Sequence, residues 1–301
     1  KRNLQPPFKA IRNTDYAGNF DDFLDAVEKE APFCFWLGTS EPHRAYEKGA
    51  GKRTGKDPAK VIVPSIFPDN AIVRSDILDY YVEVEHFDLM VERAIASLEK
   101  RGHLDNTIVV VTSDHGMPFP RAKASLYDWG SRVPLAIRWP RGIRNPGRDV
   151  KDFVHLSDLA PTFIEAAGAD VPSMMTASSL MKIFSGQKMN DRDAAYFAME
   201  RHDGCREGGK GYPCRAVRTQ DYLYIYNFEP GRWPSGSPDP RVCARSIPFG
   251  EIDTSPTKSF MMERRWEHGI AHLAELSFGM RPAEELYDLK KDPEQLANVA
   301  G

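Results

Sequence analysis

Apolar positions along the chain follow two different periods, which predict helices and strands in turn. The run over 107–112 is short and β-branched, which is typical of a buried strand. Upstream, 20–30 and 70–100 carry apolar residues at helical spacing, and 33–37 between them is an apolar run of strand length. Strand, long helix and strand in this order indicate a βαβ unit, and therefore a parallel sheet covered by helices.

The pattern changes after about residue 185. Pro and Gly interrupt short aromatic-rich runs at 194–199 and 222–228, which are typical of antiparallel strands, and a helix is expected over 256–277. We therefore expect an α/β protein in two parts. Residues 1–185 would form the larger α/β domain, and 186–301 a smaller antiparallel sheet plus helix.

Two side chains of metal-ligand type stand where the strand over 107–112 ends. Asp114 and His115 follow it directly, and ligands of open α/β sheets bind outside the carboxyl ends of strands. The alternative is an ordinary turn in which Asp114 caps backbone amides. Lys123 lies a short loop away, before a second apolar run at 133–137, so the loop returns a cation towards the acid. The position therefore favours an anion site assisted by a metal.

These residues carry a resemblance to a known family. SDHG at 113–116, Lys123 and YDWGSRVP at 127–134 resemble the sulfatases of the alkaline phosphatase superfamily. More narrowly, SDHGMPFP, LYDWG, TSEPHR, ERH and the terminal ELYDLKKDPEQLANVA resemble the heparan N-sulfatase (sulfamidase) branch, and the similarity runs from about residue 33 to the end. The resemblance implies an alkaline phosphatase-like, mostly parallel sheet flanked by helices.

The resemblance also implies roles for four residues. Asp114 and His115 would bind a divalent metal, and Lys123 would contact a sulfate oxygen or the hydroxyl of the nucleophile. His43, in the TSEPHR segment, would contact the sulfate or protonate the leaving group. The family implies Ca²⁺, whereas an imidazole ligand better suits Mn²⁺ or Zn²⁺, so all three ions stay open.

Three further residues are candidates for binding the substrate. Arg44 beside His43 would bind a substrate anion, or else pair with Glu41 or Glu47. Glu200 and His202 follow the predicted strand over 194–199 and would line the wall that contacts the sugar. The alternative for both is a solvated polar turn.

Sulfatases form their nucleophile, a formylglycine, from a cysteine in C-x-[PA]-x-R within the N-terminal half. This sequence begins without that half, so we expect it to be the C-terminal portion of a longer polypeptide, inactive alone. The segment 214–218 fits the motif formally, but it leads into an alternating run typical of a peripheral sheet. A phosphodiesterase or phosphonate hydrolase of the same superfamily stays open as the alternative function, as does an inactive pseudoenzyme.

The four cysteines leave the redox compartment open. Cys205 and Cys214 flank a Gly-rich loop that a disulfide would close in an oxidising compartment, and Cys243 then has no partner. Export to the periplasm or the outside is implied by the resemblance alone.

The amino-acid composition limits the classes of partner that the chain is expected to bind. With 40 basic and 43 acidic residues, the net charge of -3 offers no nucleic-acid footprint. No stretch approaches the roughly 20 apolar residues that span a bilayer. We expect a sulfated carbohydrate as substrate, no nucleic acid and no membrane span, and a homo-oligomer stays open.

Overall fold

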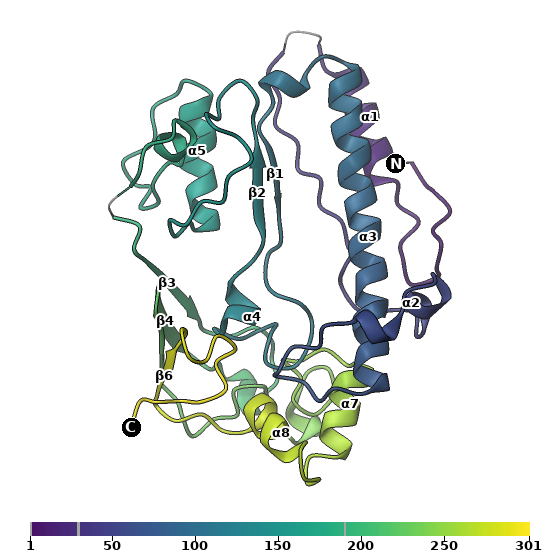
Figure 1. Cartoon of the computed structure of the whole chain (residues 1–301), viewed down its shortest axis with the longest axis vertical. Helices are drawn as coiled ribbons and strands as arrows, with labels where there is room; N and C mark the ends of the chain where they lie inside the picture. The colour runs from purple at the N-terminus through teal and green to yellow at the C-terminus, as the bar shows by residue number, and fades with distance from the viewer. Residues whose placement is uncertain (1, 29–30, 190) are drawn as a thin grey trace.

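One long helix organises the first part of the chain in the computed structural model, which describes residues 2–28, 31–189 and 191–301. Helix α3, Ala71–Lys100, confirms the helix predicted over 70–100. It begins where the Asn70 side chain accepts hydrogen bonds from the backbone N–H groups of Ile72 and Val73, at 2.8 and 3.1 Å. Helices α1, α2 and α7 pack along it at different heights (Figure 1).

The remaining elements are short. Besides α3, the described residues form α1 (Tyr16–Ala26), α2 (Ala50–Arg53), β1 (Val109–Thr112), α4 (Asp128–Ser131), β2 (Leu135–Arg138), α5 (Leu159–Ala166), α6 (Met181–Phe184), β3 (Ala194–Met199), β4 (Cys214–Thr219), β5 (Tyr222–Asn227), α7 (Pro256–Glu263), α8 (Ala271–Phe278) and β6 (Glu284–Asp288). Single turns of 3₁₀ helix lie between several of them. None of the described helices combines the length and apolar character needed to cross a membrane.

The first helix begins earlier than predicted. The expected range was 20–30, whereas α1 starts at Tyr16, because the Asp15 carboxylate accepts the backbone N–H of Gly18 at 2.9 Å and caps the helix there. Positions 29 and 30 of the predicted range lie outside the described residues.

The segment predicted as a strand over 33–37 has the side-chain alternation of a strand but no hydrogen-bonded partner strand in the described residues. Its side chains alternate as in a strand, with Phe33, Phe35 and Leu37 packed towards α1 and Trp36 89% exposed. However, the segment has no ladder partner among the described residues. Its burial comes from packing one face on helices, and such packing supplies no hydrogen bonds to a neighbouring strand.

The expected parallel pairing therefore does not occur at this place. Strand β1 pairs with β2 instead, and the two are antiparallel, with Val109 opposite Arg138 and Thr112 opposite Leu135. The loop that carries Asp114, His115 and Lys123 connects these two strands. Because β1 and β2 form a ladder, both ends of that loop are held side by side.

The C-terminal part contains the antiparallel sheet predicted for it. The strand order is β3-β4-β5-β6, and every neighbouring pair is antiparallel. The single helix predicted over 256–277 is instead two helices, α7 and α8. The chain breaks between them, where Gly269 has a φ of 85°, a left-handed conformation that continues no helix. The sheet, α7 and α8 lie together at the lower end of the molecule (Figure 1).

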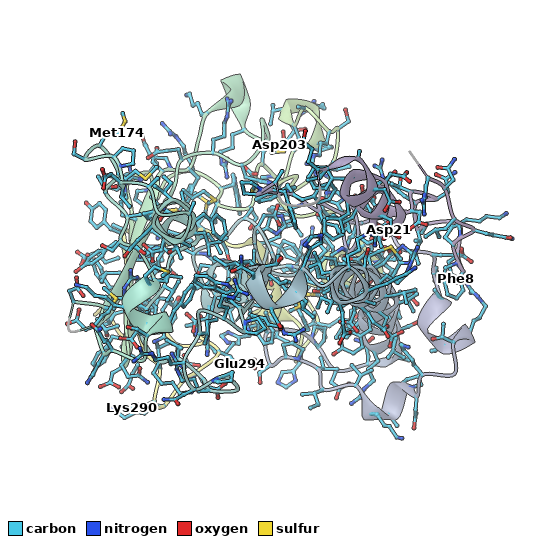
Figure 2. The ribbon with its side chains drawn as sticks, turned by 90° about the horizontal axis from the view of Figure 1, so that it is seen from above. Phe8, Asp21, Met174, Asp203, Lys290 and Glu294 are labelled. Carbon is cyan, nitrogen blue, oxygen red and sulfur yellow. The ribbon has the colours of Figure 1, made fainter. Side chains whose placement is uncertain are left out.

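One apolar core joins residues from both parts of the chain. Ile66 and Ile77 from the α3 region pack with Phe119 from the β1–β2 loop and with Phe249 and Met261 from the C-terminal part. The boundary near residue 185 stays a prediction. Seen from above, Phe8 and Asp21 lie at one side of the molecule and Met174 and Lys290 at the other (Figure 2).

Candidate active site

Two of the predicted catalytic residues lie together. The Lys123 ammonium is 3.5 Å from Nε2 of His43, at the limit of a hydrogen bond, although 80 positions separate them in sequence. Lys123 is buried, with 4% of its surface exposed, whereas His43 is exposed to solvent. The pair therefore places a buried cation directly behind an accessible imidazole.

The ring of His43 has a defined orientation. Its Nδ1 contacts the carbonyl oxygen of Arg44, which requires a proton on Nδ1, because a carbonyl only accepts. The Nε2 lone pair then faces the Lys123 ammonium. Nε2 is therefore the atom of His43 at which a proton can be gained or lost.

The loop that holds Lys123 is anchored by its neighbours. Phe119 is fully buried in the main core, and Arg121 is 3% exposed and donates to the carbonyl of Leu276 at 2.7 Å. Arg121 and Ala124 both have a φ of 59°, the left-handed region that side chains other than glycine rarely adopt. Packing on both sides of Lys123 thus holds the backbone in a conformation that it would not adopt by itself.

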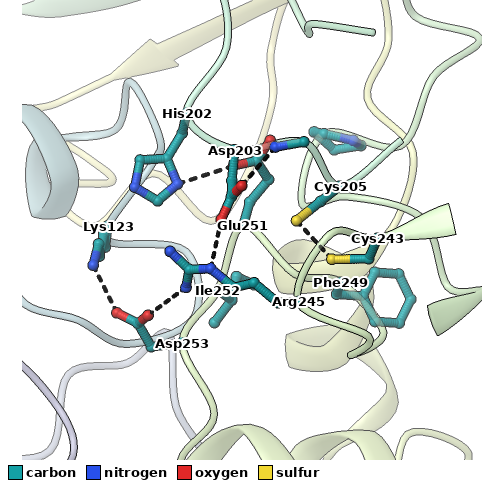
Figure 3. Close-up of polar contacts among 12 residues, drawn as sticks. Lys123, His202, Asp203, Cys205, Cys243, Arg245, Phe249, Glu251, Ile252 and Asp253 are labelled. Atoms are coloured by element: carbon teal, nitrogen blue, oxygen red, sulfur yellow. Dashed lines mark hydrogen bonds and ion pairs between the residues drawn. The ribbon is translucent and has the colours of Figure 1, made fainter. Parts of the chain in front are cut away.

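A buried carboxylate that the sequence did not single out holds the Lys123 ammonium. Asp253, 6% exposed, accepts from Lys123 Nζ at 2.8 Å and from Arg245 Nη1 at 3.0 Å (Figure 3). Burial alone would raise the pKa of Asp253, but hydrogen bonds and charges from Lys123 and Arg245, with the charge of His43, hold that pKa below its usual range. Asp253 is therefore the buried counterion of the Lys123 ammonium.

Arg245 extends this network to Asp203, with which it forms an ion pair. Asp203 directly follows His202, one of the predicted substrate-binding residues. The contacts therefore run from His43 through Lys123, Asp253 and Arg245 to the loop after β3. Figure 3 shows the part from Lys123 to Asp203.

His202 belongs to a second network in the same region (Figure 3). Its Nδ1 lies 2.9 Å from the buried carboxylate of Glu251, whose other oxygen accepts from Arg206 at 2.7 Å. The side chain of His202 is 27% exposed. Because Glu251 engages Nδ1, the other nitrogen of the ring stays free for a ligand.

The predicted metal ligands form a separate pair at the end of β1. The Asp114 side chain is 86% exposed, and its Oδ2 lies 3.6 Å from Nε2 of His115. Nδ1 of His115 is 2.8 Å from the carbonyl of Gly116, so the proton sits on Nδ1 and the Nε2 lone pair is free. No contact joins this pair to His43 or Lys123 in the described part of the chain. Their convergence on one anion stays a prediction.

Asp114 and His115 fit part of a metal site. A carboxylate oxygen of Asp114 lies 3.6 Å from an imidazole nitrogen of His115, and both are atom types that ligate metals when unprotonated. Within residues 2–28, 31–189 and 191–301, however, no group of three or more His, Cys, Asp and Glu side chains could hold an ion. The pair therefore supplies two ligands and not a whole coordination shell.

Two predicted substrate-binding residues are already occupied. Arg44 pairs with neither Glu41 nor Glu47: its side chain is 5% exposed and forms a bidentate pair with Asp76, at 2.8 and 2.9 Å. Its Nε donates to the Pro118 carbonyl at 2.8 Å, so three hydrogen bonds hold a guanidinium that is almost wholly buried and poorly placed to meet a substrate anion.

Glu200 is exposed and forms an ion pair with Arg215 on the neighbouring strand. Its position fits the alternative of a solvated polar turn better than a sugar-binding role. Of the two residues of the ERH segment predicted to bind the sugar, His202 is thus the better placed.

The structure does not bring together Cys205 and Cys214, the two cysteines considered for a disulfide. Cys214 lies in β4, opposite Met199 and Asn227, and is buried in the core of the small sheet. Burial raises its pKa to about 12, which does not suit a nucleophile. Cys205 lies instead beside Cys243, the cysteine left without a partner in the prediction.

Comparisons with known proteins agree with the sequence motifs. Residues 2–169 match the sulfatase family model, and residues 118–233 match the model for the C-terminal part of N-sulphoglucosamine sulphohydrolase. An ulvan-active sulfatase from Formosa agariphila is 28% identical over 313 aligned positions, which cover 99% of this chain and 49% of the relative. Human N-sulphoglucosamine sulphohydrolase is 24% identical, with 91% of this chain and 57% of the relative covered. The chain spans about half the length of the curated relatives that it matches.

Solved structures confirm the fold class. A protein solved in complex with its substrate D-glucosamine-2-N,6-O-disulfate superposes with a TM-score of 0.53 at 25% identity, over 84% of this chain and 40% of that one. The fold is thus the α/β fold of alkaline phosphatase-like sulfatases, with a small C-terminal antiparallel sheet.

Proposed function

Because the chain belongs to the sulfatase family, we propose that it carries the proton-transfer and anion-binding side of an active site that removes sulfate from sugars. The observation that supports this most directly is the contact between the Lys123 ammonium and Nε2 of His43. A buried cation behind an exposed imidazole provides a proton carrier together with a positive charge for an oxyanion.

Sulfate transfer develops negative charge on the sulfate oxygens and on the leaving atom. A cation fixed in place before the reaction stabilises that charge without the cost of reorienting solvent. Lys123 meets this condition, because Asp253 holds its ammonium and the loop around it is anchored by Phe119 and Arg121. Lys123 would bind a sulfate oxygen or the hydroxyl of the nucleophile.

His43 would protonate the leaving oxygen, or the leaving nitrogen of an N-sulfate. Its Nδ1 donates to the Arg44 carbonyl, so Nε2, whose lone pair faces Lys123, would take up a proton and pass it to the leaving atom. Arg44 in turn is locked by Asp76 and so positions His43 without contacting the substrate. General acid–base catalysis of this kind contributes roughly 10²- to 10⁴-fold to a rate.

A divalent ion held by Asp114 and His115 would act as a Lewis acid on the sulfate oxygens. Calcium is the favoured ion because the family resemblance implies it. Manganese and zinc stay open because an imidazole ligand suits them better than calcium. The proposed nucleophile is a formylglycine formed from a cysteine other than the four of this chain, since the one C-x-A-x-R cysteine, Cys214, is buried in β4.

N-sulfoglucosamine, as in heparan-type sugars, is the favoured substrate. The match over 118–233 to the C-terminal part of N-sulphoglucosamine sulphohydrolase supports it, as does the solved relative with a glucosamine disulfate. His202, with one ring nitrogen free, would contact the sugar. Export to the periplasm or the outside is part of the proposal because the family resemblance implies it.

The test compares variants of the full protein on three substrates: N-sulfoglucosamine, 6-O-sulfated N-acetylglucosamine and a phosphonate monoester. His43→Ala and Lys123→Ala should each lower kcat at least about 100-fold. The exposed residues His268 and Lys52 provide matched controls, whose Ala variants should keep full activity.

Each outcome separates the alternatives. Turnover of either sulfated sugar supports the proposal, and preference for the N-sulfate supports the sulfamidase branch. Faster turnover of the phosphonate would instead identify the alternative hydrolase. No turnover of any substrate by a protein whose formylglycine is confirmed by mass spectrometry would identify a pseudoenzyme. Unchanged kcat in His43→Ala would remove the proposed proton donor.

A further inference from the structure

Two sulfur atoms lie side by side in the interior of the C-terminal part. Sγ of Cys205 and Sγ of Cys243 are 2.7 Å apart, and the two residues are 0% and 5% exposed (Figure 3). They come from loops that are 38 positions apart in sequence. A third loop covers them at Gly250, where a Cβ atom would come within 2.2 Å of one sulfur and 2.4 Å of the other. This space admits the two sulfurs and nothing larger beside them.

We propose that Cys205 and Cys243 form a structural disulfide. The two thiols lose two protons and two electrons to a small-molecule disulfide, or to that of a thiol oxidoreductase, which leaves as two thiols. Because both sulfurs are enclosed in the folded protein, the exchange takes place before these loops pack. Once formed, the bond is shielded from reductants in solution.

The bond would join two loops that no strand ladder connects among the described residues. The region from 228 to 255 is irregular apart from one turn of 3₁₀ helix, Pro240–Val242. At the contact, the backbone contributes a hydrogen bond from Ala244 to the Gly204 carbonyl, at 3.0 Å. Without strand ladders, a covalent link is the strongest available restraint on this segment.

The position of the link relates it to the Lys123 network. Cys205 lies two residues after Asp203, and Cys243 lies two residues before Arg245. The disulfide would therefore link the two loops next to the ion pair between Asp203 and Arg245. Arg245 also binds Asp253, which holds Lys123. The disulfide would thus secure the loops whose side chains support the buried ammonium.

The direct test is peptide mapping by mass spectrometry of the full protein, secreted into an oxidising compartment and alkylated under denaturing conditions without reductant. We expect a peptide pair linked between Cys205 and Cys243, with Cys34 and Cys214 alkylated. Alkylation of both Cys205 and Cys243 would overturn the proposal, and so would a link from Cys205 to Cys214. The result does not depend on any enzymatic activity.

Stability supplies the second measurement. The oxidised protein should unfold at least about 5 °C above the same chain carrying both thiols, with no mutation required. The double variant Cys205→Ser, Cys243→Ser should match the dithiol form, whereas Cys34→Ser, at an exposed cysteine, should leave the midpoint unchanged. Equal midpoints for the oxidised and dithiol forms would exclude a stabilising link.

Discussion

Removing the Asp76 carboxylate should destabilise the protein strongly, because it would leave a buried guanidinium without its counterion. Arg44 and Asp76 are 5% and 1% exposed and share two hydrogen bonds of 2.8 and 2.9 Å. Asp76 also accepts from the Thr257 hydroxyl at 2.6 Å, which links α3 to the start of α7. The change Asp76→Ala removes all these acceptors at once.

The cost follows from what Arg44 would keep. Its Nε would still donate to the Pro118 carbonyl, and its guanidinium would still lie 4.4 and 4.5 Å from the ring centres of Tyr46 and Phe119. Neither contact neutralises the charge. Breaking a buried ion pair by removing one partner costs about 3–5 kcal/mol of the free energy of unfolding. At about 1.4 kcal/mol for each factor of ten, the unfolded fraction rises by roughly two to four orders of magnitude.

The assay is urea unfolding of the full protein, followed by tryptophan fluorescence. Asp88→Ala is the matched control, since Asp88 is exposed on the same helix and its loss should change stability by about 0.5 kcal/mol at most. Adding Arg44→Met to Asp76→Ala should recover much of the loss, because no buried charge remains. A loss below about 1 kcal/mol in Asp76→Ala, or an equal loss in Asp88→Ala, would refute this account of the pair.

Three further outcomes are expected. Asp253→Asn should lower kcat roughly 10- to 100-fold with little change in KM, because Lys123 loses its counterion. The control Asp239→Asn, in an exposed ion pair, should leave kcat unchanged. The same kcat in both variants would contradict the role of Asp253. Gly250→Ala should lower the free energy of unfolding by about 1–3 kcal/mol, because the added methyl group would press against both sulfurs. Gly231 has open space around it, so Gly231→Ala should leave stability unchanged. Equal thermal midpoints for the two variants would count against the enclosed sulfur pair. Burial, with the nearby charge of Glu41, raises the pKa of Glu83 from 4.5 to about 7. Between these two pH values the folded protein keeps a proton on Glu83 that the unfolded chain has released. The contribution of Glu83 to the free energy of unfolding is therefore fully present below pH 4.5 and is lost as the pH rises to about 7. Glu83→Gln should flatten that loss, and parallel curves of unfolding midpoint against pH would show that Glu83 does not titrate in this range.

The candidate site illustrates what motifs can and cannot locate. His43 and Lys123 were found because each lies in a segment with a recognisable local pattern, and the structure brings them within 3.5 Å. Asp253 lies 130 positions from Lys123 in an irregular loop with no distinctive spacing. It stands between Ile252 and Thr254, a setting that many solvated loops share and that marks no site. Arg44 is a residue that a motif marked for the wrong role. Its place beside His43 indicated substrate binding, and nothing in the local sequence pointed to its ion pair with Asp76 in α3.

Periodicity alone determined the elements whose stability is largely local. Helix α3 and the strands β3 and β5 lie close to where the pattern placed them, since helical spacing and side-chain alternation act over a few residues. Strand partners and long-range pairs were decided by tertiary structure. The segment 33–37 has the alternation of a strand but no ladder, β1 pairs with β2, and Cys205 meets Cys243 and not Cys214. A local pattern specifies which face of a segment is buried, whereas its neighbour depends on how the whole core packs.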